Sequence, residues 1–290
     1  MSGSLLVLLC YIMWGLIAAY WSMFSTVDPM AVLAFRIAWS MVFCLILIVA
    51  GKQTDTLKKV LRDKKQMLTL LAAGVVVSLN WGGYITAVMT GRVLDASLAY
   101  YMYPLFSIVL GSFVYGEKLR PLQWLAFILA LIGVIVPMVA YGELPLFAIF
   151  IGVSFAVYGA IKKKVTAPGI TSIFVETMWV TPIALAYLFL VSDLSNVTSF
   201  QWWMLPTTGI ATSVPLILFS IGMKTTSLSL AGVLMYINPT IQLLIGVFFY
   251  GEAFTKVHGI MYAFVWVGVA LFLWDSLKHR GKPVENEITI

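Results

Sequence analysis

Two ionisable side chains stand well inside stretches of sequence that are otherwise apolar, and they are the first candidates for chemistry. Arg36 carries a forked guanidinium, which binds carboxylates through two parallel hydrogen bonds. Glu176 carries a carboxylate that an amine or a transferable proton would complement. Because a buried charge is costly unless it is paired, we expect both side chains to face a cavity and contact a solute. The alternative is that they pair with each other or with the backbone and only hold the chain together.

A second set of candidates consists of aromatic and amide side chains in apolar stretches. Aromatic rings suit flat or cationic organic solutes, although such rings also pack against each other or lie at a membrane surface. The amides must find hydrogen bonds, either with a solute or between helices. With Arg36 and Glu176, the candidate binding residues are Trp14, Asn80, Trp81, Tyr84, Tyr101, Tyr158, Trp179, Tyr236 and Asn238.

Two prolines fall near the middle of apolar stretches. Pro104 and Pro239 each remove a backbone hydrogen bond and free the carbonyl one turn earlier, on Tyr100 and Met235. A kink beside a cavity serves as a hinge or offers an acceptor to a ligand. We expect Pro104 and Pro239 to act as gating or hinge residues.

The elements that position these residues must be membrane spans. Of the 290 residues, 61% are hydrophobic and 10% are charged, against roughly 25% charged in an ordinary soluble protein. This composition excludes a soluble enzyme and a nucleic-acid-binding protein. Cys10 and Cys44 show no disulfide or metal spacing, and the sequence holds no catalytic motif or Walker A motif. We therefore expect no enzyme, no metal and no cofactor.

Charges and clusters of Gly, Pro, Ser and Asp divide the chain into ten apolar helices. They are expected at residues 3–24, 30–50, 67–90, 96–115, 121–140, 145–161, 169–191, 202–222, 228–250 and 256–276. Fifteen Lys and Arg residues, Lys162 among them, fall in loops on one side, and only Arg92 and Lys256 fall on the other. Because basic loops mark the cytoplasmic side, both termini are predicted to be cytoplasmic. The fold class is an all-α polytopic membrane protein.

The second half of the chain repeats the first at an offset of 135 residues. The pattern Y-x-x-P-x6-G-x-F-x-Y-G-E begins at Tyr101 and again at Tyr236. Residues 1–141 are predicted to form the first repeat, residues 142–278 the second, and residues 279–290 a cytoplasmic tail. Each repeat has five helices, an odd number, so the second copy enters the membrane inverted. Inverted repeats are typical of secondary transporters, whose halves exchange conformations and give alternating access to a central site.

Several short motifs together point to one family. They include Trp14-Gly15, Arg36-x-x-Trp39-Ser40, Asn80-Trp81, Glu176-Thr177-x-Trp179 and Tyr250-Gly251-Glu252. Over nearly its whole length the sequence resembles the RarD group of EamA-type carriers in the drug/metabolite transporter superfamily. The resemblance implies a ten-helix permease of the bacterial inner membrane, in a family that moves amino acids, metabolites and drug-like solutes. This sequence departs from the family in having Tyr103 before Pro104, where Asn is more usual, and Asn238 before Pro239.

The resulting expectation is a monomeric carrier of a small organic solute, surrounded by lipid and without a nucleic-acid partner. If transport is coupled to protons, Glu176 is the residue expected to carry them, because it is the carboxylate that lies clearly inside a span. The alternatives are a facilitated-diffusion carrier or channel without ion coupling and, as a different class, an integral membrane enzyme.

Overall fold

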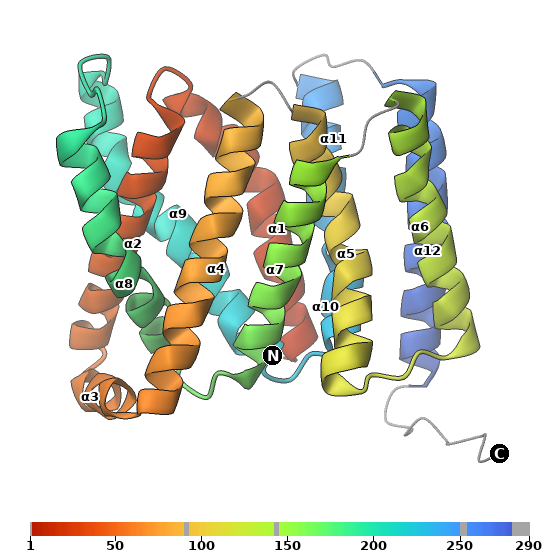
Figure 1. Cartoon of the computed structure of the whole chain (residues 1–290), viewed down its shortest axis with the longest axis horizontal. Coiled ribbons are helices and arrows are strands. Elements are labelled where there is room, and N and C mark those ends of the chain that lie inside the picture. The colour runs from red at the N-terminus through yellow and green to blue at the C-terminus, as the bar shows by residue number, and fades with distance from the viewer. Residues whose placement is uncertain (1, 90–92, 142–144, 250–253, 280–290) are drawn as a thin grey trace.

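The computed structural model describes residues 2–89, 93–141, 145–249 and 254–279, in which all regular secondary structure is helical (Figure 1). Within this part of the chain, nine helices are long and apolar enough to cross a membrane. The first helix adds a shorter apolar segment, Gly3–Ile17. The prediction of an all-α, multi-pass membrane protein is therefore confirmed as a class.

Most helices lie within a few residues of the predicted ranges. One short 3-10 turn, η1 (Ser22–Phe24), follows the first helix. The α-helices are α1 Gly3–Trp21, α2 Pro29–Ala50, α3 Thr54–Arg62, α4 Lys64–Met89, α5 Val93–Tyr115, α6 Pro121–Tyr141, α7 Leu146–Lys164, α8 Gly169–Leu190, α9 Ser199–Met223, α10 Leu228–Leu234, α11 Ile237–Phe249 and α12 Lys256–Lys278.

Helix α3 is absent from the ten predicted helices. It is short and amphipathic: Leu57 and Val60 pack towards the core, while its basic side chains are exposed. Its polar composition explains why a division into apolar stretches does not find it. Asp63 then accepts hydrogen bonds from the backbone N–H groups of Lys65 and Gln66, at 3.0 and 3.1 Å, so α4 begins earlier than predicted.

The two prolines of the repeated motif lie in different local structures. Pro104 lies inside the continuous helix α5. The predicted helix 228–250 is instead broken between α10 and α11, where the backbone N–H of Asn238 bonds the carbonyl of Met235 at 3.0 Å. Pro239, which has no N–H to donate, is the third residue of α11 and so lies in the first turn after this break. The hinge role of both prolines stays a prediction.

The helix bounds recur along the chain. Helices α1 and α7 both have 19 residues, and α2 and α8 both have 22. Three helices of the first half begin 135 residues before three of the second half, which is the offset at which the sequence motifs align. The pairs of starting residues are Lys64 and Ser199, Val93 and Leu228, and Pro121 and Lys256.

Helices of one half pack mainly against helices of the other half. α1 packs against α9 and α11, whereas α7 packs against α4 and α5. α2 packs against α8 and α9, and α6 pairs with α12 at one edge of the bundle (Figure 1). α1 begins, and α12 ends, at the end of the bundle where α3 lies; this end is called the α3 end below.

Candidate functional site

One group of polar and aromatic side chains, here called the arginine cluster, lies on the side of the bundle away from the α3 end. Its members are Arg36, Thr212, Trp21, Trp81, Tyr20, Tyr84 and Tyr100. The guanidinium of Arg36 lies 4.3 Å from the ring centroid of Trp21 and 5.0 Å from that of Trp81. Its Nε donates a hydrogen bond to Oγ1 of Thr212 at 3.1 Å. Two stacked rings and one hydrogen bond therefore fix the plane of the guanidinium.

The charge of Arg36 has aromatic and hydroxyl neighbours. The three tyrosines of the arginine cluster interact with it electrostatically. Among the side chains that the structure describes, Arg36 forms no ion pair with a carboxylate. Arg36, Trp81, Tyr84 and Tyr100 are all only half-buried. The guanidinium is therefore a cation that two rings and one hydroxyl group hold in place, without a carboxylate partner among the described residues.

A second group, here called the lysine–glutamate cluster, lies nearer the α3 end. Its members are Lys162 and Tyr158 of α7 and Ser172 and Glu176 of α8. Oε1 of Glu176 accepts from Nζ of Lys162 at 2.5 Å and from Oγ of Ser172 at 2.8 Å, and Oε2 accepts from the hydroxyl of Tyr158 at 3.0 Å. Lys162 is fully buried and Glu176 is 3% exposed. Within this cluster the carboxylate has an internal counter-ion.

The position of Lys162 corrects the sequence analysis. Lys162 is one of the residues that the sequence analysis assigned to a cytoplasmic loop, but it lies in the last turn of α7 and its side chain points into the bundle. The run Lys162 to Lys164 suggests a solvated end, and the sequence alone does not show that Glu176, fourteen residues later, reaches the first of the three lysines. Glu176 pairs with Lys162, so the described structure does not show the Arg36–Glu176 pair that the sequence left open as the alternative to solute contact.

A glycine allows the close packing around Glu176. A Cβ on Gly74 of α4 would lie 2.7 Å from the carbonyl oxygen of Glu176. Only the absence of a side chain at Gly74 lets α4 approach α8 this closely. α4 therefore packs directly against the backbone of α8 at Glu176.

Lys224 lies just beyond the end of α9, close to the lysine–glutamate cluster. Its Nζ donates to the carbonyl oxygens of Thr166 and Ala167 at 3.1 and 2.5 Å. Burial lowers the pKa of Lys224, and the nearby charge of Lys162 lowers it further. Lys224 therefore adds one further cationic group close to Lys162.

Aromatic rings pack around Tyr158 of the lysine–glutamate cluster. Tyr158 stacks on Phe219 with ring centroids 5.8 Å apart, and Trp14 contacts Phe219 at 6.1 Å and Phe155 at 5.5 Å. A small hollow is lined by both Trp81 of the arginine cluster and Glu176. Trp14 and Tyr158 therefore share Phe155 and Phe219 as neighbours, and Trp81 and Glu176 line the same hollow.

The remaining predicted residues lie elsewhere or make internal contacts. Tyr84 joins the arginine cluster, with its ring 5.9 Å from that of Tyr100. Nδ2 of Asn80 donates to the carbonyl of Ile151 at 2.7 Å and to Ser154, which links α4 to α7. Oδ1 of Asn238 accepts from Gln242 at 2.7 Å. Both amides are therefore satisfied within the protein.

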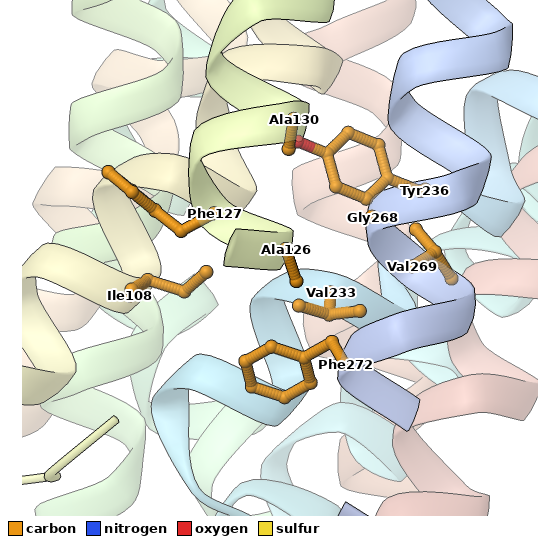
Figure 2. A pocket seen from close by; sticks show the side chains of 9 residues that line it. All are labelled: Ile108, Ala126, Phe127, Ala130, Val233, Tyr236, Gly268, Val269 and Phe272. Atoms are coloured by element: carbon orange, nitrogen blue, oxygen red, sulfur yellow. The ribbon is translucent and has the colours of Figure 1, made fainter. Parts of the chain in front are cut away.

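Tyr101 and Tyr236 lie together in a separate apolar cluster. The hydroxyl of Tyr236 donates to the carbonyl of Tyr101 at 3.1 Å, and the hydroxyl of Tyr101 bonds that of Tyr262. Figure 2 shows a hollow between α5, α6, α10 and α12 that is apolar apart from Tyr236. None of its lining residues belongs to the arginine cluster or the lysine–glutamate cluster.

Trp179 is 43% exposed and contacts neither cluster. It lies three residues after Glu176 on α8, yet its side chain is exposed whereas that of Glu176 is buried. Several residues of the two clusters were not predicted from the sequence: Lys162, Ser172, Thr212, Tyr20 and Trp21. Trp21 could have been found, because it lies seven residues after Trp14 and therefore on the same face of α1.

Comparisons with known proteins give the chain its class. The sequence profile of the EamA-like transporter family matches residues 1–138 and again residues 144–274. Protein RarD of Escherichia coli (strain K12) is 37% identical over 280 residues, which cover 95% of each chain. The uncharacterized transporter YojE of Bacillus subtilis (strain 168) is 36% identical, over 96% of this chain and 95% of its own. A solved crystal structure with 21% identity superposes with a TM-score of 0.76, over 96% of this chain and 98% of that one.

The apolar helices and these relatives define a multi-pass membrane transporter of the drug/metabolite transporter type. The chain belongs to the EamA-like transporter family, as a RarD-type member. The solved structure, at its low identity, shows that the fold is shared. The family is one of transporters, which is consistent with the expectation that the chain is not an enzyme.

Proposed function

We propose that this protein is a secondary transporter that moves a small organic solute across the bacterial inner membrane by alternating access. Ten spans form two inverted repeats, residues 1–141 and 142–278, with both termini on the cytoplasmic side, and the monomer is the working unit. The recurring helix bounds support this layout, and so do the contacts of α1 and α7, each of which packs against helices of the other half. Two halves that pack against each other through corresponding helices are suited to exchanging conformations.

The observation that carries the proposal is the setting of Arg36. It lies in the second turn of α2, roughly 10 Å along the helix at 1.5 Å per residue. A cation at this depth in a lipid-facing position would cost at least about 2.5 kcal/mol, so it is expected where it has a function. Trp21, Trp81 and Thr212 orient it, and its half-buried position leaves room for a solute.

A thermal-stability screen of the purified protein tests this proposal. Amino acids, organic acids, amines, nucleosides and amphipathic drugs are added to wild type, to Arg36→Ala and to Lys58→Ala, a control that loses an exposed cation. A solute at about 100 times its dissociation constant should stabilise the protein by roughly 2.7 kcal/mol. We expect stabilisation in wild type and in the control but not in Arg36→Ala. Stabilisation that survives in Arg36→Ala would move the site away from Arg36.

The coupling ion is proposed to be a proton carried by Glu176, with Lys162 as its counter-ion. A proton that binds Glu176 displaces Lys162, and Lys162 returns when the proton leaves. Glu176→Gln in proteoliposomes should therefore lose accumulation driven by a pH gradient while keeping counterflow. Accumulation that is unchanged in Glu176→Gln would contradict the coupling role.

Facilitated diffusion is the second candidate, and the ion pair itself favours it. Because Lys162 already neutralises Glu176, the pair could remain intact throughout transport and only join α7 to α8. In that case a pH gradient would drive no accumulation in wild type, although counterflow would still be present. The measurement of accumulation therefore separates the two candidates.

A further inference from the structure

We infer that the arginine cluster binds an organic anion, with a carboxylate on Arg36 and a flat unsaturated body beside the tryptophan rings, and that zwitterions and cations are poor ligands. This inference rests on the proposed carrier function and narrows its substrate class. From the sequence, Glu176 is expected to meet either an amine or a coupling proton, and its contact with Lys162 argues against the amine.

The described side chains of the two clusters carry one uncompensated charge, that of Arg36. Glu176 is the acidic side chain that would hold a substrate ammonium, but Lys162 already lies 2.5 Å from it, and Ser172 and Tyr158 also donate to it. A substrate amine would have to displace a buried lysine that bonds both Glu176 and Ser172. The described charges of the two clusters are therefore Arg36, which is positive, and a pair that is neutral.

The acidic residue nearest to Arg36 in the sequence already has partners of its own. Asp28 lies two turns earlier, and its carboxylate accepts from the backbone N–H groups of Met30 and Ala31 at 3.1 and 3.2 Å. It also accepts from the hydroxyl of Tyr187 at 2.5 Å. Asp28 therefore serves as the N-cap of α2 and is committed to its own contacts.

The aromatic rings of the arginine cluster do not favour a cationic solute. Rings of this kind attract cations, but the faces of Trp21 and Trp81 already hold the guanidinium of Arg36 at 4.3 and 5.0 Å. A second cation beside them would be repelled by the first. Because Thr212 engages Nε, the terminal nitrogens of Arg36 are left to bind a carboxylate as a fork. A flat body attached to that carboxylate would lie against the same rings.

Two matched series of small molecules test the inference. The first is phenylacetate, phenylalanine and phenethylamine, and the second is indole-3-acetate, tryptophan and tryptamine. Within each series the body is similar and the charge runs from anion through zwitterion to cation. Binding is measured by thermal shift and by quenching of tryptophan fluorescence in wild type, Arg36→Gln, Thr212→Val and Lys58→Gln.

We expect each acid to bind at least tenfold more tightly than its amine in wild type, with the zwitterion between them. Arg36→Gln should lose the preference, and Lys58→Gln, which removes an exposed cation, should keep it. Thr212→Val keeps the charge and frees only Nε, so it should weaken binding of the acids by about threefold to tenfold, as expected for one lost hydrogen bond. Thr212→Val also supplies the test if Arg36→Gln does not fold.

Equal or tighter binding of the amines or zwitterions would overturn the inference, and so would acid binding that persists in Arg36→Gln. Failure of both acids to bind wild type would also overturn it. The carrier proposal is judged separately by counterflow. If an amine shows saturable counterflow, the carrier proposal is supported and the anion site is contradicted. If no member of either series or of the wider screen shows counterflow, the carrier proposal itself is contradicted.

Discussion

The two charged clusters differ in how their charges are compensated. In the lysine–glutamate cluster, cation and carboxylate meet at 2.5 Å, both are buried, and two hydroxyl groups also donate to the carboxylate. In the arginine cluster, the cation is half-buried and held by rings and one hydroxyl group. The lysine–glutamate cluster has no net charge without a solute. The arginine cluster carries one positive charge that an anionic solute would neutralise. We therefore propose that Arg36 recognises the solute and that the pair has a coupling or locking role.

The largest effect is expected from removing one partner of the buried pair. Lys162→Met should destabilise the protein by about 3–5 kcal/mol, because it leaves the carboxylate of Glu176 buried without a counter-ion. The double variant Lys162→Met/Glu176→Gln removes both charges and should recover most of that loss. Melting temperatures in detergent measure both variants. A double variant no more stable than the single one would show that the pair is not the source of the effect.

An intermediate effect is expected from adding a methyl group beside the pair. The Cβ of Gly74→Ala would lie 2.7 Å from the carbonyl oxygen of Glu176, so this overpacking should cost about 1–3 kcal/mol. Gly82→Ala is the matched control on the same helix, because nothing lies within 4 Å of its added Cβ. That control should be neutral or slightly stabilising, since Ala favours a helix more than Gly does. Equal melting temperatures for the two variants would argue against close packing at Glu176.

The smallest effect is expected in the arginine cluster, where each ring contributes only part of the binding. Trp81→Leu should weaken binding of phenylacetate by roughly 0.5–1 kcal/mol, because one face of the guanidinium loses its aromatic neighbour. Trp179→Leu, at an exposed position outside both clusters, should leave binding unchanged. Titrations followed by thermal shift compare the two. A larger loss in Trp179→Leu than in Trp81→Leu would place the solute elsewhere.

The repeated motif predicts which residues correspond but not the local backbone of each copy. Tyr101 and Tyr236 align in the sequence, and the structure places them in contact. Pro104 and Pro239 align equally well, yet the helix continues through one and is broken just before the other. A sequence pattern records which residues correspond, whereas the local backbone depends on which neighbours pack against each copy.

The sequence by itself determined the class of the protein, through apolar stretches of membrane length, and singled out Arg36 and Glu176 as candidate site residues. Those conclusions follow from hydropathy and from the rarity of charge in such stretches, which are properties of the chain alone. Only the tertiary structure decided that Glu176 meets Lys162 and that Trp21 and Thr212 hold Arg36. The physical reason is that compensation of a buried charge depends on distances between helices, and packing sets those distances.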